Sequence, residues 1–285
     1  MPVDIMIVGA TKSGTSTLLA YLGQHTRIQR QEPREMMWFK KASLPSEPFD
    51  ESLYFTSPRH DRLRLGKLAL LMYHDEYVDR LKTLNPNVQT IAILRDPVAR
   101  AYSAFSMGRR LGREPVPDFG DALRAAADDH GPDSLRFQYL EAGRYSAGIE
   151  RLQERMPPGS VHVIILEEFL ADAKAAVAAL ANRLNLNVEG FGDEIPHENA
   201  ARSARSPDAA RVRKMQTIRR ARGALPAPVR GALGGLYRRM NLSETRLGPM
   251  DPATERELCD YFSESNRQLE ELLGRPIEAW HRTDG

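Results

Sequence analysis

Three short apolar runs are spaced along the chain, and each lies beside a segment of helical character. The runs at residues 5–8, 88–94 and 161–165 are rich in Ile, Val and Leu, which is typical of buried strands. Residues 16–22 and 76–84 carry apolar residues at helical spacing next to the first two runs. Strands that alternate with helices predict an α/β fold of three layers, with a central parallel sheet flanked by helices.

The rest of the chain separates into further helices and irregular segments. Residues 172–185 and 251–273 have the spacing of amphipathic helices, and a Gly-Arg-Pro sequence ends the second. Residues 40–66 and 186–208 carry several prolines and glycines and are predicted to be loops. Loops of this length in a compact domain are often functional. We expect a single domain over residues 1–285.

Composition narrows the class of protein further. The 285 residues are 41% hydrophobic and 27% charged, enough to bury one large core. Forty Lys and Arg face 38 Asp and Glu, and a net charge of +2 gives no reason to expect a nucleic-acid partner. The single cysteine, Cys259, cannot form an internal disulfide. The start of the chain lacks signal-peptide features, so we expect a cytoplasmic protein.

The first predicted strand leads through a glycine loop, residues 9–15, into a helix. This arrangement points backbone N–H groups and the positive end of a helix dipole at an anion. Gly9 and Gly14 have the spacing of the P-loop of nucleoside triphosphatases, but Thr15 replaces its lysine and the lysine stands at Lys12. The loop is therefore P-loop-like and favours one terminal phosphate or sulfate. A glycine-rich turn without a ligand is the alternative.

Two motifs resemble those of sulfotransferases that use 3'-phosphoadenosine-5'-phosphosulfate (PAPS), in their heparan-sulfate-type and bacterial branch. The first resembles that family's 5'-phosphosulfate loop and comprises Lys12, Ser13, Gly14, Thr15, Ser16, Thr17 and Leu18. The second, residues 94–103, resembles the 3'-phosphate segment, which implies that Arg95 and Ser103 bind the 3'-phosphate. Both residues can face one phosphate, because one closes a strand and the other lies two turns into a helix. An Arg-Asp pair that caps a helix is the alternative.

The segment Arg34-Glu35-Met36-Met37-Trp38-Phe39 resembles the family's Lys-Glu-x-x-Phe-Phe segment, whose glutamate is the general base. The resemblance implies that Glu35 is the base, with Lys12 as the group that stabilises the leaving phosphate oxygen. Glu32 is a rival base, and from residue types alone Glu35 could be a solvated carboxylate. Trp38 and Phe39 are candidate contacts with a substrate.

Several other basic residues are candidates for contacts with donor or acceptor. Lys67 lies where related enzymes carry a lysine, and a surface lysine is the alternative. Arg202 and Arg205 lie in a loop where relatives place donor-phosphate contacts. Residues 209–243 hold nine Arg or Lys and no acid, which suits an acidic acceptor, a peripheral membrane contact or a solvated helix face. Residues 143–145 and 166–172 and the C-terminal segment with Trp280 resemble architectural parts of the family.

The resemblance implies transfer of a sulfuryl group from PAPS to a hydroxyl or amine, which yields adenosine 3',5'-bisphosphate (PAP). The acceptor would be a small molecule or a carbohydrate or lipid-linked compound, such as a glycan, glycolipid or secondary metabolite. It would meet residues 36–66 and 186–240. No metal is expected, since the histidines show no paired spacing. A PAP-binding or glycan-binding protein without turnover and a small-molecule kinase are the alternatives; the displaced lysine disfavours the kinase. The sequence indicates no oligomeric state.

Overall fold

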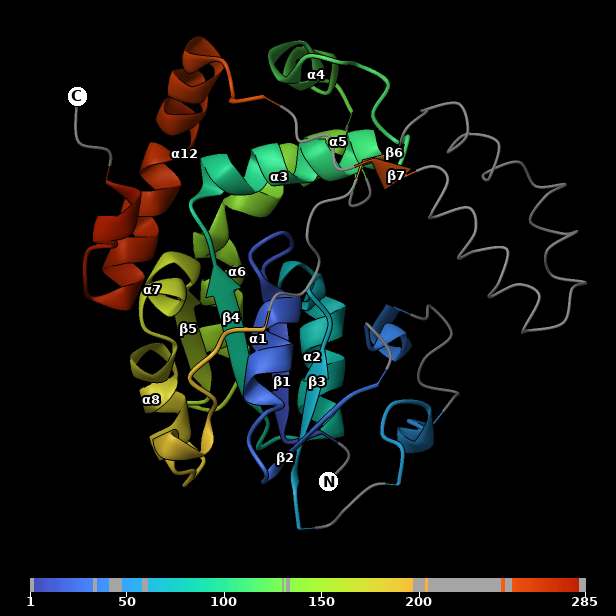
Figure 1. Cartoon of the computed structure of the whole chain (residues 1–285), viewed down its shortest axis with the longest axis vertical. Helices are drawn as coiled ribbons and strands as arrows, with labels where there is room; N and C mark the ends of the chain where they lie inside the picture. The colour runs from blue at the N-terminus through green and yellow to red at the C-terminus, as the bar shows by residue number, and fades with distance from the viewer. Residues whose placement is uncertain are drawn as a thin grey trace, which may run out of the picture. The chain divides into compact units, whose positions relative to one another are not determined.

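The computed structural model describes residues 3–32, 35–40, 48–57, 61–129, 131, 134–196, 203–204, 242–243 and 248–281. The chain divides into two compact units (Figure 1). The first comprises Met1–Arg100, Ala142–Asn199 and Tyr261–Gly285, and the second comprises Ala101–Glu141 and Ala200–Asp260. The single domain over residues 1–285 stays a prediction.

A five-stranded sheet forms the centre of the first unit. Its order is β2-β3-β1-β4-β5, and every neighbouring pair is parallel. The strands are β1 (Ile5–Gly9), β2 (Ile28–Arg30), β3 (Leu63–Lys67), β4 (Gln89–Leu94) and β5 (Val161–Ile165). The three strands predicted from apolar runs are therefore confirmed as β1, β4 and β5.

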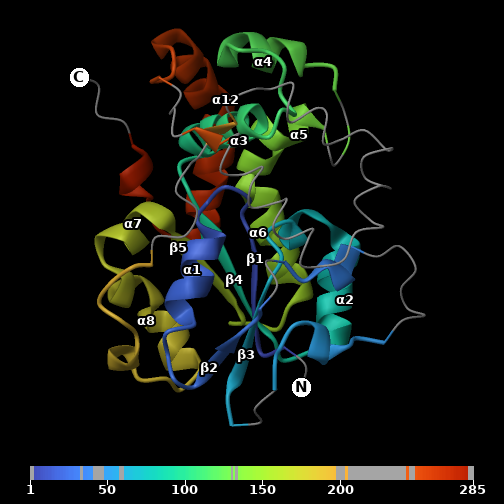
Figure 2. The ribbon, with the colours of Figure 1, turned by 45° about the vertical axis from the view of Figure 1, so that its right-hand side comes forward.

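Helices cover both faces of this sheet. Successive residues of a strand point to opposite faces, so each strand contributes side chains to both layers of helices. Ile7 and Ile93 pack in one core cluster with residues of α1 (Thr15–Leu22) and α8 (Ala173–Arg183). Val8 and Leu94 pack in the other with residues of α2 (Asp75–Leu84) and α6 (Tyr145–Arg155). Figure 2 shows α1 and α8 on one side of the strands and α2 on the other. The predicted three-layer α/β fold is confirmed.

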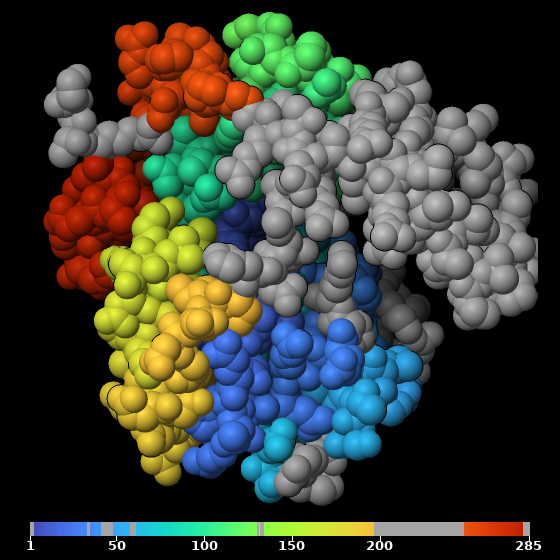
Figure 3. All heavy atoms as spheres, viewed as in Figure 1, coloured from blue at the N-terminus to red at the C-terminus, as the bar shows by residue number. Residues whose placement is uncertain are grey.

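Short elements connect these layers in the first unit. They are α7 (Leu166–Ala171) and the 3-10 helices η1 (Met37–Lys40), η2 (Glu51–Leu53), η3 (Leu71–Tyr73), η5 (Val188–Gly190) and η6 (Glu278–Trp280). The Gln24 side chain accepts from the backbone N–H of Gly192 at 3.0 Å and donates to the carbonyl of Glu194 at 3.2 Å. In Figure 3 the segment after α8 accordingly lies against the N-terminal segment on the surface.

The second unit is mostly helical. It holds most of α3 (Pro97–Arg110), α4 (Phe119–Ala125), α5 (Leu135–Tyr139), the first residue of η4 (Glu141–Gly143), the start of α12 (Pro252–Leu273) and the antiparallel pair β6 (Ser203–Ala204) and β7 (Leu242–Ser243). The ring centroids of Phe105 and Phe119 are 4.9 Å apart. The Tyr139 hydroxyl donates to the buried carboxylate of Glu114 at 2.6 Å. Within the described ranges, every helix is too short or too polar to cross a bilayer.

The prediction of an irregular segment over residues 40–66 is wrong at its C-terminal end, where β3 begins. Two cations and a glycine hide this strand from apolar periodicity. Arg64 is buried and its guanidinium pairs with the Glu51 carboxylate at 2.6 Å. Because partners distant in sequence satisfy these charges, a polar sequence can form an inner strand. The predictions for Arg202, Arg205 and nearly all of residues 209–243 lie outside the described residues.

Candidate active site

The predicted site residues follow the carboxyl ends of neighbouring strands. Lys12 follows β1, Lys67 ends β3, Arg95 follows β4 and Glu35 comes a few residues after β2. All these strands are parallel, so their carboxyl ends meet at one edge of the sheet. Crevices at this edge are the usual ligand sites of open α/β sheets. The sheet therefore gathers the first unit's candidate residues in one place.

The loop after β1 has the backbone of an anion cradle. Lys12 and Gly14 adopt left-handed conformations, with φ of 68° and 85°. A Cβ on Gly14 would lie 2.8 Å from Leu166 Cδ1, so both space and backbone favour glycine here. Gly14 is also the N-cap of α1, and the N–H groups of the first helical turn have no acceptor within their own helix. These groups and the helix dipole can bind a phosphate or sulfate.

Glu35 and Lys67 form an ion pair beside this loop. The Lys67 ammonium lies 3.1 Å from one carboxylate oxygen of Glu35 and donates to the Ser16 hydroxyl at 2.9 Å. The Lys67 side chain is 4% exposed and that of Glu35 is 31% exposed. Lys67 is thus not a surface lysine. It links the predicted base to the first turn of α1, while the carboxylate stays open to solvent.

Backbone contacts hold both members of the pair. The second Glu35 oxygen accepts from the Ala69 N–H at 3.0 Å. The Lys67 N–H donates to Gln31 Oε1 at 2.6 Å, and the Lys67 carbonyl accepts from the Met36 N–H at 2.8 Å. The base is therefore fixed to the end of β3 rather than carried on a free loop. Glu32, its rival, is exposed.

Buried polar side chains lie close to the anion loop and Arg95. Burial lowers the pKa of the Arg100 guanidinium, the nearby Tyr145 and Tyr73 hydroxyls raise it, and the like charge of Arg95 lowers it. Burial raises the pKa of the Tyr73 hydroxyl. The charge of Arg100 and hydrogen bonds with Thr11 lower this pKa and offset part of the effect. The positive charges of Arg95 and Arg100 repel each other, and a bound anion would offset this repulsion, which suits a phosphate site.

The turn after β4 serves two purposes. The Tyr145 hydroxyl donates to the Arg95 carbonyl at 2.9 Å. The Asp96 carboxylate accepts from the Ala99 N–H at 2.9 Å and so caps α3. The helix cap weighed from the sequence is therefore present in Asp96, and it leaves the Arg95 side chain half-buried at the edge of the site.

One comparison decides the family. The sequence model for the family described as "Sulfotransferase domain" matches residues 2–204. The chain belongs to this family.

Relatives of this sulfotransferase domain include two human enzymes named bifunctional heparan sulfate N-deacetylase/N-sulfotransferase 2 and 3. Each is 23% identical to this chain, and the match covers 98% of this chain's length. The chain spans 31% of the length of these relatives. A sulfotransferase structure from Alicyclobacillus acidocaldarius matches with a TM-score of 0.67 and 22% identity, over 98% of this chain and 99% of that one. The two proteins share a fold.

The aromatic side chains predicted to contact substrate lie mostly in the core of the sulfotransferase domain. Phe39 is fully buried, and Trp38 is partly buried against it with ring centroids 5.2 Å apart. The Trp38 N–H donates to the Tyr54 hydroxyl at 3.0 Å. The exposed member of η1 is Met37, at 51%.

The remaining sequence predictions divide between the two units. Thr15 is buried and Thr17 half-buried on α1. Ser103 is half-buried on α3 in the second unit, so its shared phosphate contact with Arg95 stays a prediction. Sequence reasoning gave no role to Tyr73 or Arg100. The sequence alone gives little indication of such residues, because a single polar residue within an apolar segment is hard to distinguish from a surface residue. Among the described residues, no group of three His, Cys, Asp or Glu could hold a metal ion.

Proposed function

We propose that this chain transfers the sulfuryl group of PAPS to a hydroxyl or amine of an acceptor and releases PAP. The main support for this proposal is the pair of contacts that Lys67 makes with Glu35 and Ser16. These contacts join a solvent-accessible carboxylate to the first turn of the helix behind the anion loop. A base and an anion cradle that share one lysine are suited to group transfer from an anionic donor. The names of the human relatives make a carbohydrate amine or hydroxyl a natural first acceptor to test.

The fit of the donor follows from charge and position. Loop N–H groups and Lys12 would hold the 5'-phosphosulfate, and Arg95, with Ser103, would hold the 3'-phosphate. Arg95 lies beside the loop, because β1 and β4 are neighbours in the sheet. The buried Arg100 adds positive charge on the same side.

The reaction needs one proton transfer and one exchange of bonds. Glu35 takes the proton from the acceptor hydroxyl or amine, whose oxygen or nitrogen forms a bond to sulfur. The bond between sulfur and the bridging phosphate oxygen breaks, and its electron pair leaves on that oxygen with PAP. Lys12 and the N-terminus of α1 stabilise the charge that develops there.

The proposal predicts that Glu35→Gln lowers turnover about a hundredfold or more, because the amide cannot accept the proton. PAP affinity, measured by calorimetry, should stay near the wild-type value. Turnover is followed with PAPS and a panel of glycan, glycolipid and small-molecule acceptors, by the mass gain of one sulfuryl group. Glu32→Gln, which alters the exposed carboxylate three residues earlier, is the matched control.

Three results would reject this proposal. Full activity of Glu35→Gln would show that another group is the base. PAP binding by the wild type without transfer to any acceptor would favour a binding protein. Phosphorylation of an acceptor from ATP would favour a kinase.

A further inference from the structure

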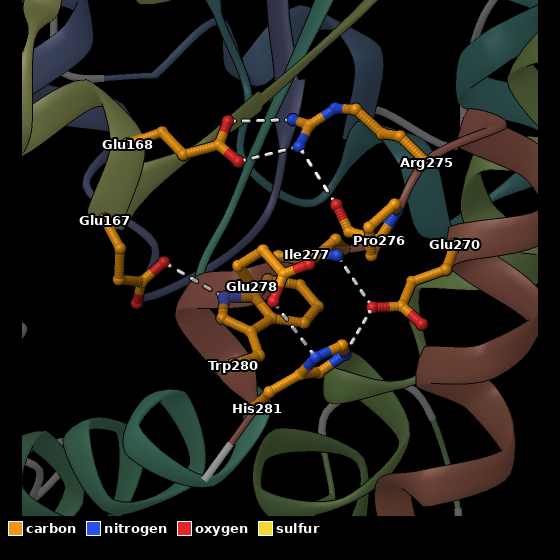
Figure 4. A network of polar contacts seen from close by, with 9 residues as sticks. All are labelled: Glu167, Glu168, Glu270, Arg275, Pro276, Ile277, Glu278, Trp280 and His281. Carbon is orange, nitrogen blue, oxygen red and sulfur yellow. Dashed lines mark hydrogen bonds and ion pairs between the residues drawn. The ribbon is translucent and has the colours of Figure 1, made fainter. Parts of the chain in front are cut away.

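The turn that carries Arg95 is held by two residues from elsewhere in the first unit. One oxygen of the Glu167 carboxylate accepts from the Asp96 N–H at 3.1 Å, and the other accepts from the Trp280 indole N–H at 3.0 Å. Figure 4 shows Glu167 on α7 pointing at the indole. The Tyr145 hydroxyl donates to the Arg95 carbonyl, and its ring lies 5.9 Å from that of Trp280. The turn therefore contacts Glu167 and Tyr145, and both of these contact Trp280.

Trp280 is itself held by its own segment. The Arg275 guanidinium makes two hydrogen bonds to Glu168, at 2.7 and 2.8 Å. The Glu270 carboxylate accepts from the Ile277 N–H at 2.7 Å and contacts the His281 ring at 2.9 Å. These contacts surround η6 in Figure 4 and leave Trp280 only 8% exposed. The indole N–H is thus presented to Glu167 from a fixed place.

We infer that Glu167 is a positioning residue for Arg95. Its carboxylate holds the peptide N–H directly after Arg95, and Trp280 holds the carboxylate. A charged acceptor makes stronger hydrogen bonds than a neutral one, so this bridge fixes the direction in which the arginine leaves β4. The inference rests on the proposed function, in which Arg95 meets the donor's 3'-phosphate. A misplacement of about 1 Å is enough to weaken such a contact strongly.

The test compares two nucleotides that differ in one phosphate group. Calorimetry of the full chain measures the affinities for PAP and for adenosine 5'-monophosphate, which lacks the 3'-phosphate. Glu167→Gln and Trp280→Phe should weaken PAP binding about tenfold, since a hydrogen bond that involves a charge is lost or weakened. Affinity for the monophosphate should not change. Trp280→Phe keeps an aromatic ring against Tyr145 but removes the indole N–H together with part of the buried ring system, so it supplies a second variant that leaves the Glu167 carboxylate in place.

Arg267→Gln is the matched control. It breaks the ion pairs with Glu264 and Glu271 within α12 and touches neither Glu167 nor the contacts that hold Trp280, so it should leave both affinities unchanged. If the Glu167 and Trp280 variants weaken both nucleotides equally, or neither, their role is structural and the inference is overturned. If the wild type binds no PAP, the proposed function fails and the inference fails with it.

Discussion

The ion pair between Glu35 and Lys67 is unequally exposed, and this predicts unequal effects of removing either partner. Lys67 is 4% exposed and Glu35 31%. Glu35→Leu leaves an ammonium inside the protein with the Ser16 hydroxyl as a remaining contact. Lys67→Met leaves a carboxylate that water can reach and that keeps the Ala69 N–H. The first change should therefore destabilise the protein more than the second.

The expected magnitudes follow from these environments. Removal of one partner costs about 3 kcal/mol when the charge left behind is buried. It costs about 1 kcal/mol when the remaining charge is largely solvated. The double variant should be nearly as stable as Lys67→Met, because no buried charge remains. The coupling free energy is then about 3 kcal/mol in magnitude.

Urea unfolding of the wild type, both single variants and the double variant measures these quantities. Equal slopes of the unfolding free energy against urea concentration show that only stability has changed, and the midpoints then give the coupling. Additive effects of the two changes, or a larger loss for Lys67→Met than for Glu35→Leu, would refute the reasoning.

Two further predictions concern the anion loop and the sheet. Gly14→Ala should lower the free energy of unfolding by about 1–2 kcal/mol, because alanine disfavours the left-handed backbone. It should also weaken PAP binding, measured by calorimetry. Gly159→Ala is the control, since Gly159 has a φ of 74° before β5, and it should leave PAP binding unchanged. Burial, and then the charge of Arg183, lower the pKa of His162 on β5. The unfolded chain therefore takes up a proton below a pH of about 6.5 while the folded chain stays neutral. The unfolding free energy should fall as the pH drops through this range, and urea midpoints should show a flatter fall for His162→Gln; identical slopes in both proteins would contradict this.

How well the sequence predicts this fold depends on how each element is stabilised. β5 appears within its predicted bounds, because an apolar run acts locally. β2 and β3 were not predicted. The first is short and the second contains Arg64 and Lys67, whose partners come from other segments. Local patterns cannot show such partners.

The same distinction applies to the candidate site. The anion loop could be predicted, since its glycine, lysine and helix lie within a few residues. The contact between Glu35 and Lys67 could not, because it exists only when β3 lies between β2 and β1. The sequence left Lys67 open between a ligand contact and a surface position. The position was decided by the order of the strands.

That order also separates the two substrates of the proposed reaction. Across the edge of the sheet the residues run Glu35 after β2, Lys67 on β3, Lys12 after β1, Arg95 after β4 and Glu167 after β5. Neighbouring strands lie about 4.8 Å apart. The base follows β2 and Arg95 follows β4, and these two strands lie on opposite sides of β1, which leads into the anion loop. A nucleotide held by the loop and Arg95 leaves the β2 side to the acceptor. On this proposal, residues near η1 and η2, including the exposed Met37 and Leu53, select the acceptor, while changes at Arg95 and Glu167 alter donor affinity alone.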